Sequence, residues 1–223
     1  MKIKEYLKKD FIDECIVFFG DSVNEILNEE VDEVLLHSME LRPGDSFSFY
    51  SLPLYVVVRM TKPEIVIETG TQNGGSAQTI LYGLYKNNKG FLHSIDSGHE
   101  STDDTHTITN GQPGERITEF LKSRWVLHLG FSYDKLRPLL DDVKIVDLFF
   151  HDSDHSKKCV EFEFNEIIKN INTNSLIGMH DHYSQWDSQK ILLGFEQIFA
   201  KKRPNVHSYM GEYHNVLRLW KKM

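Results

Sequence analysis

Two short clusters of titratable side chains each follow a mostly apolar segment of the chain. Residues 151–155 read His-Asp-Ser-Asp-His directly after the segment 145–150, and residues 180–182 read His-Asp-His directly after 176–179. Carboxylates that gather in one cleft repel each other unless protons or a cation neutralise them. A divalent cation there can lower the pKa of a bound hydroxyl group, and an imidazole can accept its proton. The two clusters therefore predict one shared site, in which a divalent cation is the simple way to neutralise the carboxylates.

The elements that must position these clusters alternate between strands and helices after Pro63. The pattern predicts strands over residues 64–68, 91–95, 125–129, 146–150 and 175–179. It predicts helices over residues 76–85, 115–122, 133–140, 156–171 and 188–201. Such alternation implies a parallel sheet that helices cover on both faces. Ligands bind outside the carboxyl ends of the strands in sheets of this kind, so both clusters should face one crevice.

The two ends of the chain depart from this alternation. Residues 206–210 and 215–220 are predicted to form a hairpin, so the last strand should run antiparallel to its neighbour. Residues 1–40 are predicted to be helical, with a capping box at Ser22 and Glu25. A short helix is expected over residues 53–60. The chain is therefore divided into an N-terminal helical extension, residues 1–60, and an α/β domain, residues 61–223.

A glycine-rich turn follows the first predicted strand and reads Glu-Thr-Gly-Thr-Gln-Asn-Gly-Gly-Ser over residues 68–76. Glycines at a strand-to-helix turn let the backbone approach a ligand closely, although such turns are common. Glu68 would repel a pyrophosphate and attract a ligand that carries an ammonium and a sulfonium. Asp96, at the end of the second strand, can accept hydrogen bonds from both hydroxyls of a ribose. An adenosine with a positively charged tail fits both acids, and S-adenosylmethionine matches that description.

Residues 63–76 resemble motif I of class I S-adenosylmethionine-dependent methyltransferases. The resemblance is closest to the branch that contains macrocin-type O-methyltransferases and cephalosporin-hydroxylase-like proteins. Asp96 matches the ribose acid of that family, and residues 151–156 and 179–182 resemble the ends of its fourth and fifth strands. The similarity covers roughly residues 61–223. It implies an α/β fold with a doubly wound Rossmann-like sheet, mostly parallel with an antiparallel last strand.

The resemblance also implies roles for individual residues. The expected cofactor-binding residues are Glu68, Gly70, Thr71, Gly74, Ser76, Asp96, Ser132 and Asp152. Asp152, Asp181 and His182 are the expected ligands of a divalent cation, with Mg²⁺ or Mn²⁺ favoured. His155 is expected to act as the general base, and Asp154 is its rival for that role.

Other interpretations of the same residues stay open at this point. Asp154 could simply cap the helix that begins near residue 156. His151 and His180 precede the acids, and strand alternation predicts that they point away from them into the core. Where the family often has Gly-Asp-Ser after the third strand, this chain has Gly-Phe-Ser at residues 130–132, so Ser132 is left to serve the adenine edge.

Composition narrows the class of protein. The net charge is −8, and residues 1–40 hold four lysines and eleven acidic residues. No basic stripe is present, which argues against nucleic acid as a partner, and no apolar run approaches the ~20 residues of a membrane span. Cys15 and Cys159 match no metal spacing and are expected to be buried free thiols in a cytoplasmic protein. The N-terminal helices could cover the cofactor, contact a second subunit in a homo-oligomer, or extend the core.

These observations predict an S-adenosylmethionine-dependent O-methyltransferase that requires a divalent cation. Its acceptor would be a small hydroxylated molecule, such as a sugar or a natural-product intermediate. The long polar loop at residues 97–114 and the aromatic stretch 183–186 would flank this acceptor. The alternatives are a metal-dependent hydrolase or hydroxylase that uses the Asp/His cluster, and a binding module without catalysis. The hydrolase alternative leaves Glu68 and Asp96 unexplained.

Overall fold

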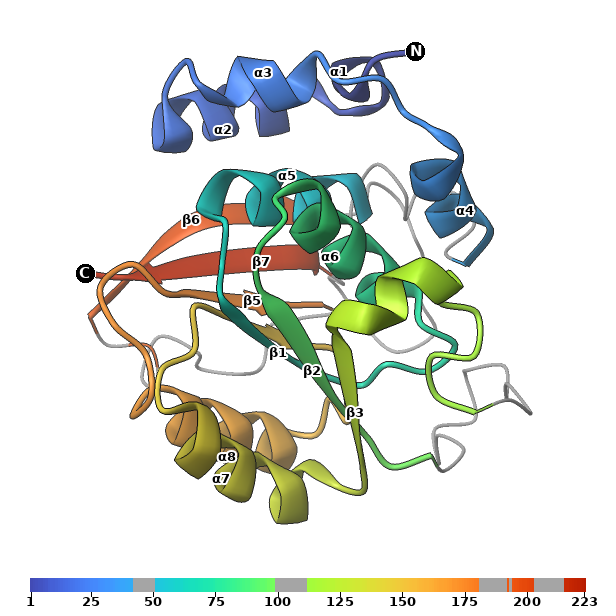
Figure 1. Cartoon of the computed structure of the whole chain (residues 1–223). Coiled ribbons are helices and arrows are strands. Elements are labelled where there is room, and N and C mark those ends of the chain that lie inside the picture. Colours follow the sequence, from blue (N-terminus) through green and yellow to red (C-terminus); the bar gives the residue numbers. More distant parts are fainter. Residues whose placement is uncertain (42–50, 99–111, 181–191, 193, 203–214) are drawn as a thin grey trace, which may run out of the picture.

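The computed structural model describes residues 1–41, 51–98, 112–180, 192, 194–202 and 215–223 (Figure 1). Within these ranges one sheet has the strand order β3-β2-β1-β4-β5-β7-β6. Strands β1 to β5 run parallel, and β7 lies antiparallel to both β5 and β6. The strands are β1 Ile65–Thr69, β2 Phe91–Asp96, β3 Trp125–Leu129, β4 Leu148–His151, β5 Leu176–Met179, β6 Phe195–Lys202 and β7 Asn215–Lys222. The predicted doubly wound sheet with an antiparallel last strand is confirmed.

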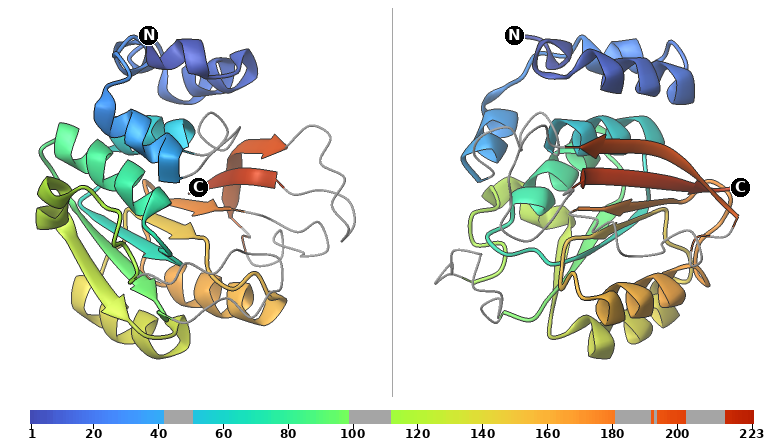
Figure 2. Two further views of the ribbon diagram at one scale, coloured as in Figure 1. Left: turned by 90° about the vertical axis from the view of Figure 1, so that its right-hand side faces the viewer. Right: turned by 180° about the vertical axis from the view of Figure 1, so that it is seen from behind.

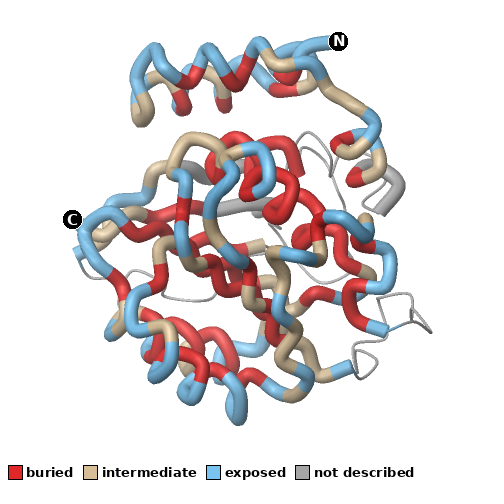
Figure 3. Tube along the Cα trace, viewed as in Figure 1, coloured by how far each residue is buried: buried red, intermediate tan, exposed pale blue. Residues whose placement is uncertain are grey.

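Helices cover both faces of this sheet. Helices α5 (Leu52–Thr61) and α6 (Gly75–Lys86) pack on one face, and α7 (Ser132–Val143) and α8 (Lys157–Ile167) pack on the other (Figure 1). Successive strand residues point to opposite faces, and both sets are apolar because both faces are covered. Val66 and Phe150 belong to one buried cluster, whereas Ile67 and Phe149 belong to the other. The buried residues accordingly concentrate in the sheet and on the inward faces of these helices (Figure 3).

Four N-terminal helices form a further layer over α5 and α6 (Figures 1 and 2). They are α1 Ile3–Tyr6, α2 Lys9–Phe19, α3 Val23–Leu27 and α4 Glu33–Leu41. Their hydrophobic side chains belong to the same buried cluster as those of α5, so the predicted helical extension shares the core of the α/β part. A polar network reinforces the contact: Arg59 Nη1 lies 2.6 Å from the Glu29 carboxylate, which also accepts from Tyr55. The predicted capping box is wrong, because the Ser22 hydroxyl donates to the carbonyl of Phe19.

Two predicted helices are corrected. Residues 195–202 form the edge strand β6, although residues 188–201 had the spacing of a helix; residues 188–191 and 193 lie outside the described residues. A register shift between Gln197 and Phe199 interrupts the two-residue alternation of β6, which makes its apolar spacing resemble a helix. The antiparallel partner of β7 is thus β6, and the predicted strand at 206–210 lies outside the described residues.

The segment 115–122 forms turns and the short 3₁₀ helix η2 (Glu119–Arg124) instead of an α-helix. Its backbone is engaged elsewhere: Gly114 N–H donates to Gln72 O, and Arg116 N–H donates to Asn73 O. These tertiary bonds attach the segment to the glycine-rich turn and compete with a regular helix. None of the helices within the described ranges has the length and apolarity needed to span a membrane.

Candidate functional site at the carboxyl ends of the strands

The glycine-rich turn between β1 and α6 is held tightly against the end of β4. Gly70 has a φ of +83°, and a Cβ at this position would lie 2.1 Å from the carbonyl oxygen of Asp152. Only glycine therefore allows both this backbone conformation and this approach. The amide of Asp152 in turn donates to the carbonyl of Thr69. The glycine-rich turn after β1 and the Asp-Ser-Asp-His segment after β4 are consequently direct neighbours, as the sequence predicted.

Asp96 organises the same turn from the end of β2. One of its carboxylate oxygens accepts from the amides of Thr71 and Gln72, each at 2.8 Å, and the other accepts from the amide of Gly98 at 2.8 Å. Charge-assisted bonds of this kind are among the stronger ones in proteins. Asp96 therefore has a structural task in shaping the turn, in addition to its predicted contact with a ribose.

Glu68 lies fully buried beneath the turn, on the face covered by α6. Its Oε2 accepts from the hydroxyls of Thr71 (3.1 Å) and Ser94 (2.8 Å), whereas its Oε1 has no hydrogen-bond partner among the described residues. Burial raises the pKa of Glu68 to about 7, although the hydroxyls of Ser76, Ser94 and Thr71 favour its ionised form. Ser76 Oγ is buried as well and has no hydrogen-bond partner of normal geometry within the described part of the chain. Two buried polar atoms beside the turn are thus available to a ligand or a water molecule.

Asp152, His155 and His180 form a compact cluster above the ends of β4 and β5. Each offers one metal-binding atom, and these atoms all lie within 4.8 Å of one another. His180 Nδ1 lies 2.8 Å from Asp152 Oδ1, and His155 Nε2 donates to the carbonyl of His180 at 3.2 Å. The prediction that His180 points away from the acids is wrong. The strand ends at Met179, so residue 180 is free of the alternation on which that prediction relied.

The last residue of β4, His151, is fully buried under this cluster, as predicted. Its Nδ1 donates to Glu163 Oε2 at 2.8 Å, while its Nε2 has no hydrogen-bond partner among the described residues. Glu163, from α8, also accepts from Thr69 (2.7 Å) and Ser153 (2.9 Å). Burial favours a raised pKa for Glu163, but the neighbouring His151 and the hydrogen bonds from Ser132 and Thr69 outweigh it and lower the pKa below its ordinary value.

Sequence reasoning missed Glu163, although a signal was present. In α8 it lies among residues that face the core, four positions after Cys159 and one before Phe164, both of which are buried. A carboxylate on the apolar face of a helix needs a partner in the core, and His151 is that partner. The hydrogen bond between His151 and Glu163 explains why His151 points into the core.

The remaining predicted residues are placed as follows. Asp154 is exposed, and both of its oxygens accept from Ser156, at 2.8 and 2.9 Å, so its contacts are those of a turn before α8. Ser132 is buried at the start of α7, with its hydroxyl 3.8 Å from the Cys159 sulfur. Asp181 and His182 lie outside the described residues, as do the stretch 183–186 and residues 99–111 of the predicted loop. Both cysteines are free and buried, as expected.

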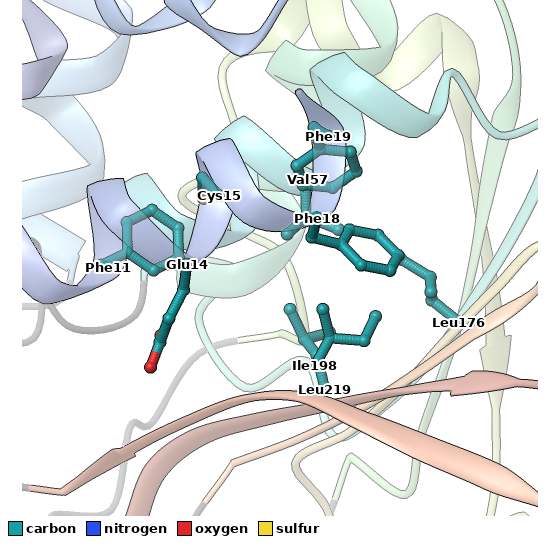
Figure 4. A pocket seen from close by; sticks show the side chains of 9 residues that line it. All are labelled: Phe11, Glu14, Cys15, Phe18, Phe19, Val57, Leu176, Ile198 and Leu219. Carbon is teal, nitrogen blue, oxygen red and sulfur yellow. The ribbon is translucent and has the colours of Figure 1, made fainter. Parts of the chain in front are cut away.

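One apolar pocket of the structure lies away from these groups. It is enclosed between α2, α5 and the strands β5 to β7 (Figure 4). Its lining residues are Phe11, Glu14, Cys15, Phe18, Phe19, Val57, Leu176, Ile198 and Leu219. The lining offers a single carboxylate and otherwise hydrophobic side chains, which suits the packing of the N-terminal layer better than group transfer. The chemistry therefore concentrates at the strand ends.

Comparison with known proteins agrees with this placement. A family model described as a methyltransferase domain matches residues 67–182, more than half of the chain. The chain belongs to this methyltransferase family. Every residue predicted for the site lies within the matched range, including the glycine-rich turn and Asp96, which the hydrolase alternative left unexplained. No curated protein matches the chain by sequence.

Solved structures of methyltransferases share the fold at low sequence identity. A putative O-methyltransferase from Klebsiella pneumoniae has a TM-score of 0.60 and 14% identity, over 93% of this chain and 97% of that one. An O-methyltransferase of tomaymycin synthesis from Streptomyces achromogenes, in complex with S-adenosylmethionine, has a TM-score of 0.57 and 15% identity, over 91% and 96%. A TDP-rhamnose 3′-O-methyltransferase of calicheamicin biosynthesis has a TM-score of 0.54 and 16% identity, over 92% and 93%. This methyltransferase thus shares the fold of S-adenosylmethionine-dependent methyltransferases over nearly its whole length.

Proposed function

We propose that this methyltransferase transfers a methyl group from S-adenosylmethionine to a hydroxyl group of a small polar acceptor. The observation that carries the proposal is the contact between the glycine-rich turn and the Asp152 segment at Gly70. It brings a turn suited to an adenosyl ligand next to a cluster suited to activating a hydroxyl group. Positioning two reactants in this way accounts for much of the rate that a transferase provides.

The residues around the turn fit the proposed cofactor. The buried Oε1 of Glu68 and Oγ of Ser76 lack partners within the described ranges, and the carboxylate of Glu68 favours a cationic ligand. Gly70 and Gly74, each with positive φ, let the turn pack closely against Asp152 and Ile117, which holds its backbone in place beside the proposed cofactor. Asp96, Thr71, Ser132 and Asp152 complete the proposed set. The bound cofactor supplies a methyl group on a positively charged sulfur.

The cluster beyond the turn would act on the acceptor. Asp152, His155 and His180 can bind a hydroxyl group, accept its proton or hold a divalent cation that lowers its pKa. His155 is the proposed base in the absence of a cation, because it lies beside Asp152 and is only partly exposed. Asp181 and His182 remain proposed contributors from the segment that follows β5.

A sugar or natural-product intermediate is the proposed acceptor. The support is the shared fold with the tomaymycin-synthesis and TDP-rhamnose enzymes, together with a sequence that carries no basic stripe for a nucleic acid. A cytoplasmic location is proposed from the two buried free thiols, which persist in a reducing compartment.

Calorimetric titration of S-adenosylhomocysteine into metal-stripped protein, repeated with Mg²⁺ and with Mn²⁺, tests the proposal. We expect saturable binding, followed by transfer from labelled S-adenosylmethionine to members of a panel of sugar nucleotides and phenolic natural products. An Asp152→Asn variant should keep S-adenosylhomocysteine binding within about tenfold and lose at least about 100-fold in transfer. Absence of binding under every metal condition would contradict the proposal.

A further inference from the structure

The sheet ends in two edge strands, β3 and β6, which differ in how they are protected against pairing with another chain. Among the described residues β3 pairs only with β2, and β6 pairs only with β7 (Figure 1). An edge strand presents a row of unpaired N–H and C=O groups, which proteins protect with charged side chains, proline or bulges. Strand β6 has two register shifts and carries the exposed Glu196. These features make β6 a poor template for a further strand.

Strand β3 lacks such protection over its whole length, Trp125–Leu129. It contains no proline, lysine, arginine or acidic residue, and its pairing with β2 has no register shift. His128 lies 3.1 Å from His93, between the ring nitrogens. Burial and the nearby Lys135 lower the pKa of His128, so its imidazole is uncharged at neutral pH. The edge formed by β3 is therefore regular and without charge.

Exposed large hydrophobic side chains gather around this edge. On β3 itself Val126 is 40% exposed and Leu129 is 54% exposed. Phe91, at the start of β2, and Phe120, in the 3₁₀ helix that leads into β3, are exposed by 47% and 45%. Contiguous apolar groups that face water are typical of surfaces that another protein covers. The edge thus has both unpaired backbone groups and apolar side chains to offer.

A second copy of the same chain fits this edge. Two β3 strands related by a two-fold axis at Leu127 run antiparallel. Trp125 then lies opposite the partner's Leu129, and Val126 lies opposite the partner's His128. All of these cross-strand pairs join uncharged side chains, which stabilise a sheet. We propose that this methyltransferase forms a homodimer in which the two β3 strands pair antiparallel and continue the sheet from one copy into the other.

Charges beside the edge are complementary under the same two-fold axis. Lys135 and Asp142 both act on the imidazole of His128, and their spacing of seven residues places them on one face of α7. Lys135 lies near the start of α7 and Asp142 near its end. Because the axis makes the two α7 helices antiparallel, the lysine side of one copy is directed toward the aspartate side of the other. Such an arrangement favours this orientation of the two copies.

The net charge of the chain does not oppose association at this edge. The whole chain carries −8, but residues 112–143, which include β3 and α7, hold five basic and five acidic residues. The acidic excess lies instead in residues 1–40, which form the N-terminal layer over α5 and α6 (Figure 2). Two copies can therefore meet at β3 without bringing their acidic regions together.

Sedimentation velocity of the full-length protein between about 1 and 200 µM tests the association. One five-residue strand pair with its flanking side chains is a small interface, so we expect a dimer with a Kd of about 1–50 µM. Val126→Lys and Leu129→Lys place a charge on the edge at exposed positions, and each should weaken dimerisation at least about tenfold. Val17→Lys on α2 is the matched control, because Val17 is 87% exposed and lies outside the edge, and it should leave the Kd unchanged. Circular dichroism verifies the folding of all three variants.

Two further measurements locate the contact. The amides of β3 should exchange hydrogen at least about tenfold more slowly at about 200 µM than at about 1 µM, whereas those of β6 should not change. Leu127→Cys, oxidised with diamide, should give a disulfide-linked dimer, because antiparallel partners on a two-fold axis bring their Cα atoms to about 4.5–5.5 Å. A chain that stays monomeric throughout, a dimer that both lysine variants leave intact, or a dimer without this cross-link would overturn the proposal. The proposed function is independent of these results, since S-adenosylhomocysteine should bind the lysine variants as it binds the unaltered protein.

Discussion

Two glutamates lie beneath the site, one on each face of the sheet, and they respond to burial in opposite ways. Glu68, on the α6 side, and Glu163, on the α8 side, are both fully buried. Burial raises the pKa of Glu68 to about 7. The pKa of Glu163 is instead below its ordinary value, because the nearby imidazole and hydrogen bonds outweigh burial. Equal burial therefore leads to a carboxyl that titrates near neutrality on one face and a stable carboxylate on the other.

The partners account for this difference. Glu68 receives hydrogen bonds only from hydroxyl groups and leaves one oxygen without a partner among the described residues. Glu163 receives them on both oxygens, and one donor is the imidazole of His151. A buried carboxylate stays ionised when donors satisfy both of its oxygens and a basic group lies beside it. The proposed cationic ligand would therefore find its unsatisfied oxygen on the α6 face, at Glu68.

Removing the satisfied carboxylate should have the largest effect. Glu163→Ala leaves the donors from His151, Thr69 and Ser153 without an acceptor, so we expect a loss of about 3–5 kcal/mol in the free energy of unfolding. Urea denaturation at pH 7 measures it. Glu163→Gln keeps an oxygen acceptor and is the matched control, with a smaller expected loss. Equal losses for both variants would mean that the charge of Glu163, and not the oxygen acceptor that glutamine keeps, accounts for the stabilisation on this face.

The second-largest loss of stability should come from Gly70→Ala, which disturbs the contact between the glycine-rich turn and the Asp152 segment. Gly70→Ala would place its Cβ 2.1 Å from the backbone oxygen of Asp152 and force a positive φ on alanine, so we expect a loss of about 3 kcal/mol. Gly20→Ala is the control for backbone strain alone, because its φ is +71° and its ψ is −172° but nothing lies within 4 Å of an added Cβ, and it should lose about 1–2 kcal/mol. Thermal denaturation of both variants checks this. Similar losses would show that the Asp152 segment is not held against the turn.

Neutralising Glu68, the carboxylate with an unpartnered oxygen among the described residues, should increase the free energy of unfolding instead of lowering it. The pKa of Glu68 rises from 4.5 in the unfolded chain to about 7 in the folded one, which corresponds to about 3 kcal/mol of destabilisation once both states are ionised. The protonated Glu68 carries no such penalty, so stability is highest below pH 4.5 and falls as the pH rises through 7. Glu68→Gln should therefore stabilise the protein by about 2 kcal/mol at pH 8 and change little near pH 4.5. Denaturation midpoints at both pH values test this, and a destabilised variant at pH 8 would contradict it.

The smallest effects should come from one threonine on each face. Thr71→Val removes a donor to Glu68, and Thr69→Val removes a donor to Glu163. Each should cost about 1–2 kcal/mol at pH 8, because the lost bond is made to a carboxylate. At pH 5 the loss for Thr71→Val should shrink, since Glu68 is protonated there, whereas the loss for Thr69→Val should persist. Parallel denaturation curves at the two pH values measure the contrast, and identical pH dependence would remove the basis for distinguishing the faces.

Much of the fold and part of the site follow from local patterns. Apolar runs separated by amphipathic stretches predicted β1 to β5 and α6 to α8, because burial on both faces of a parallel sheet leaves that pattern in the sequence. Strand β6 was mistaken for a helix, because its bulge disrupts the two-residue period and β7 supplies the hydrogen bonds. Segment 115–122 was wrongly predicted to be an α-helix. The amides of Gly114 and Arg116 bond to the glycine-rich turn, which is far away in sequence.

The sequence by itself determined the methyltransferase architecture, the glycine-rich turn, the acid at the end of β2 and the presence of Asp and His at two strand ends. These depend on residue types at short spacing, which the chain carries locally. Only the tertiary structure decided that His180 joins Asp152 and His155, that the inward-facing His151 pairs with Glu163, and that the two buried glutamates differ in pKa. Each of these depends on which groups from distant segments meet, and on the dielectric and hydrogen bonds they find there, so no local pattern contains them.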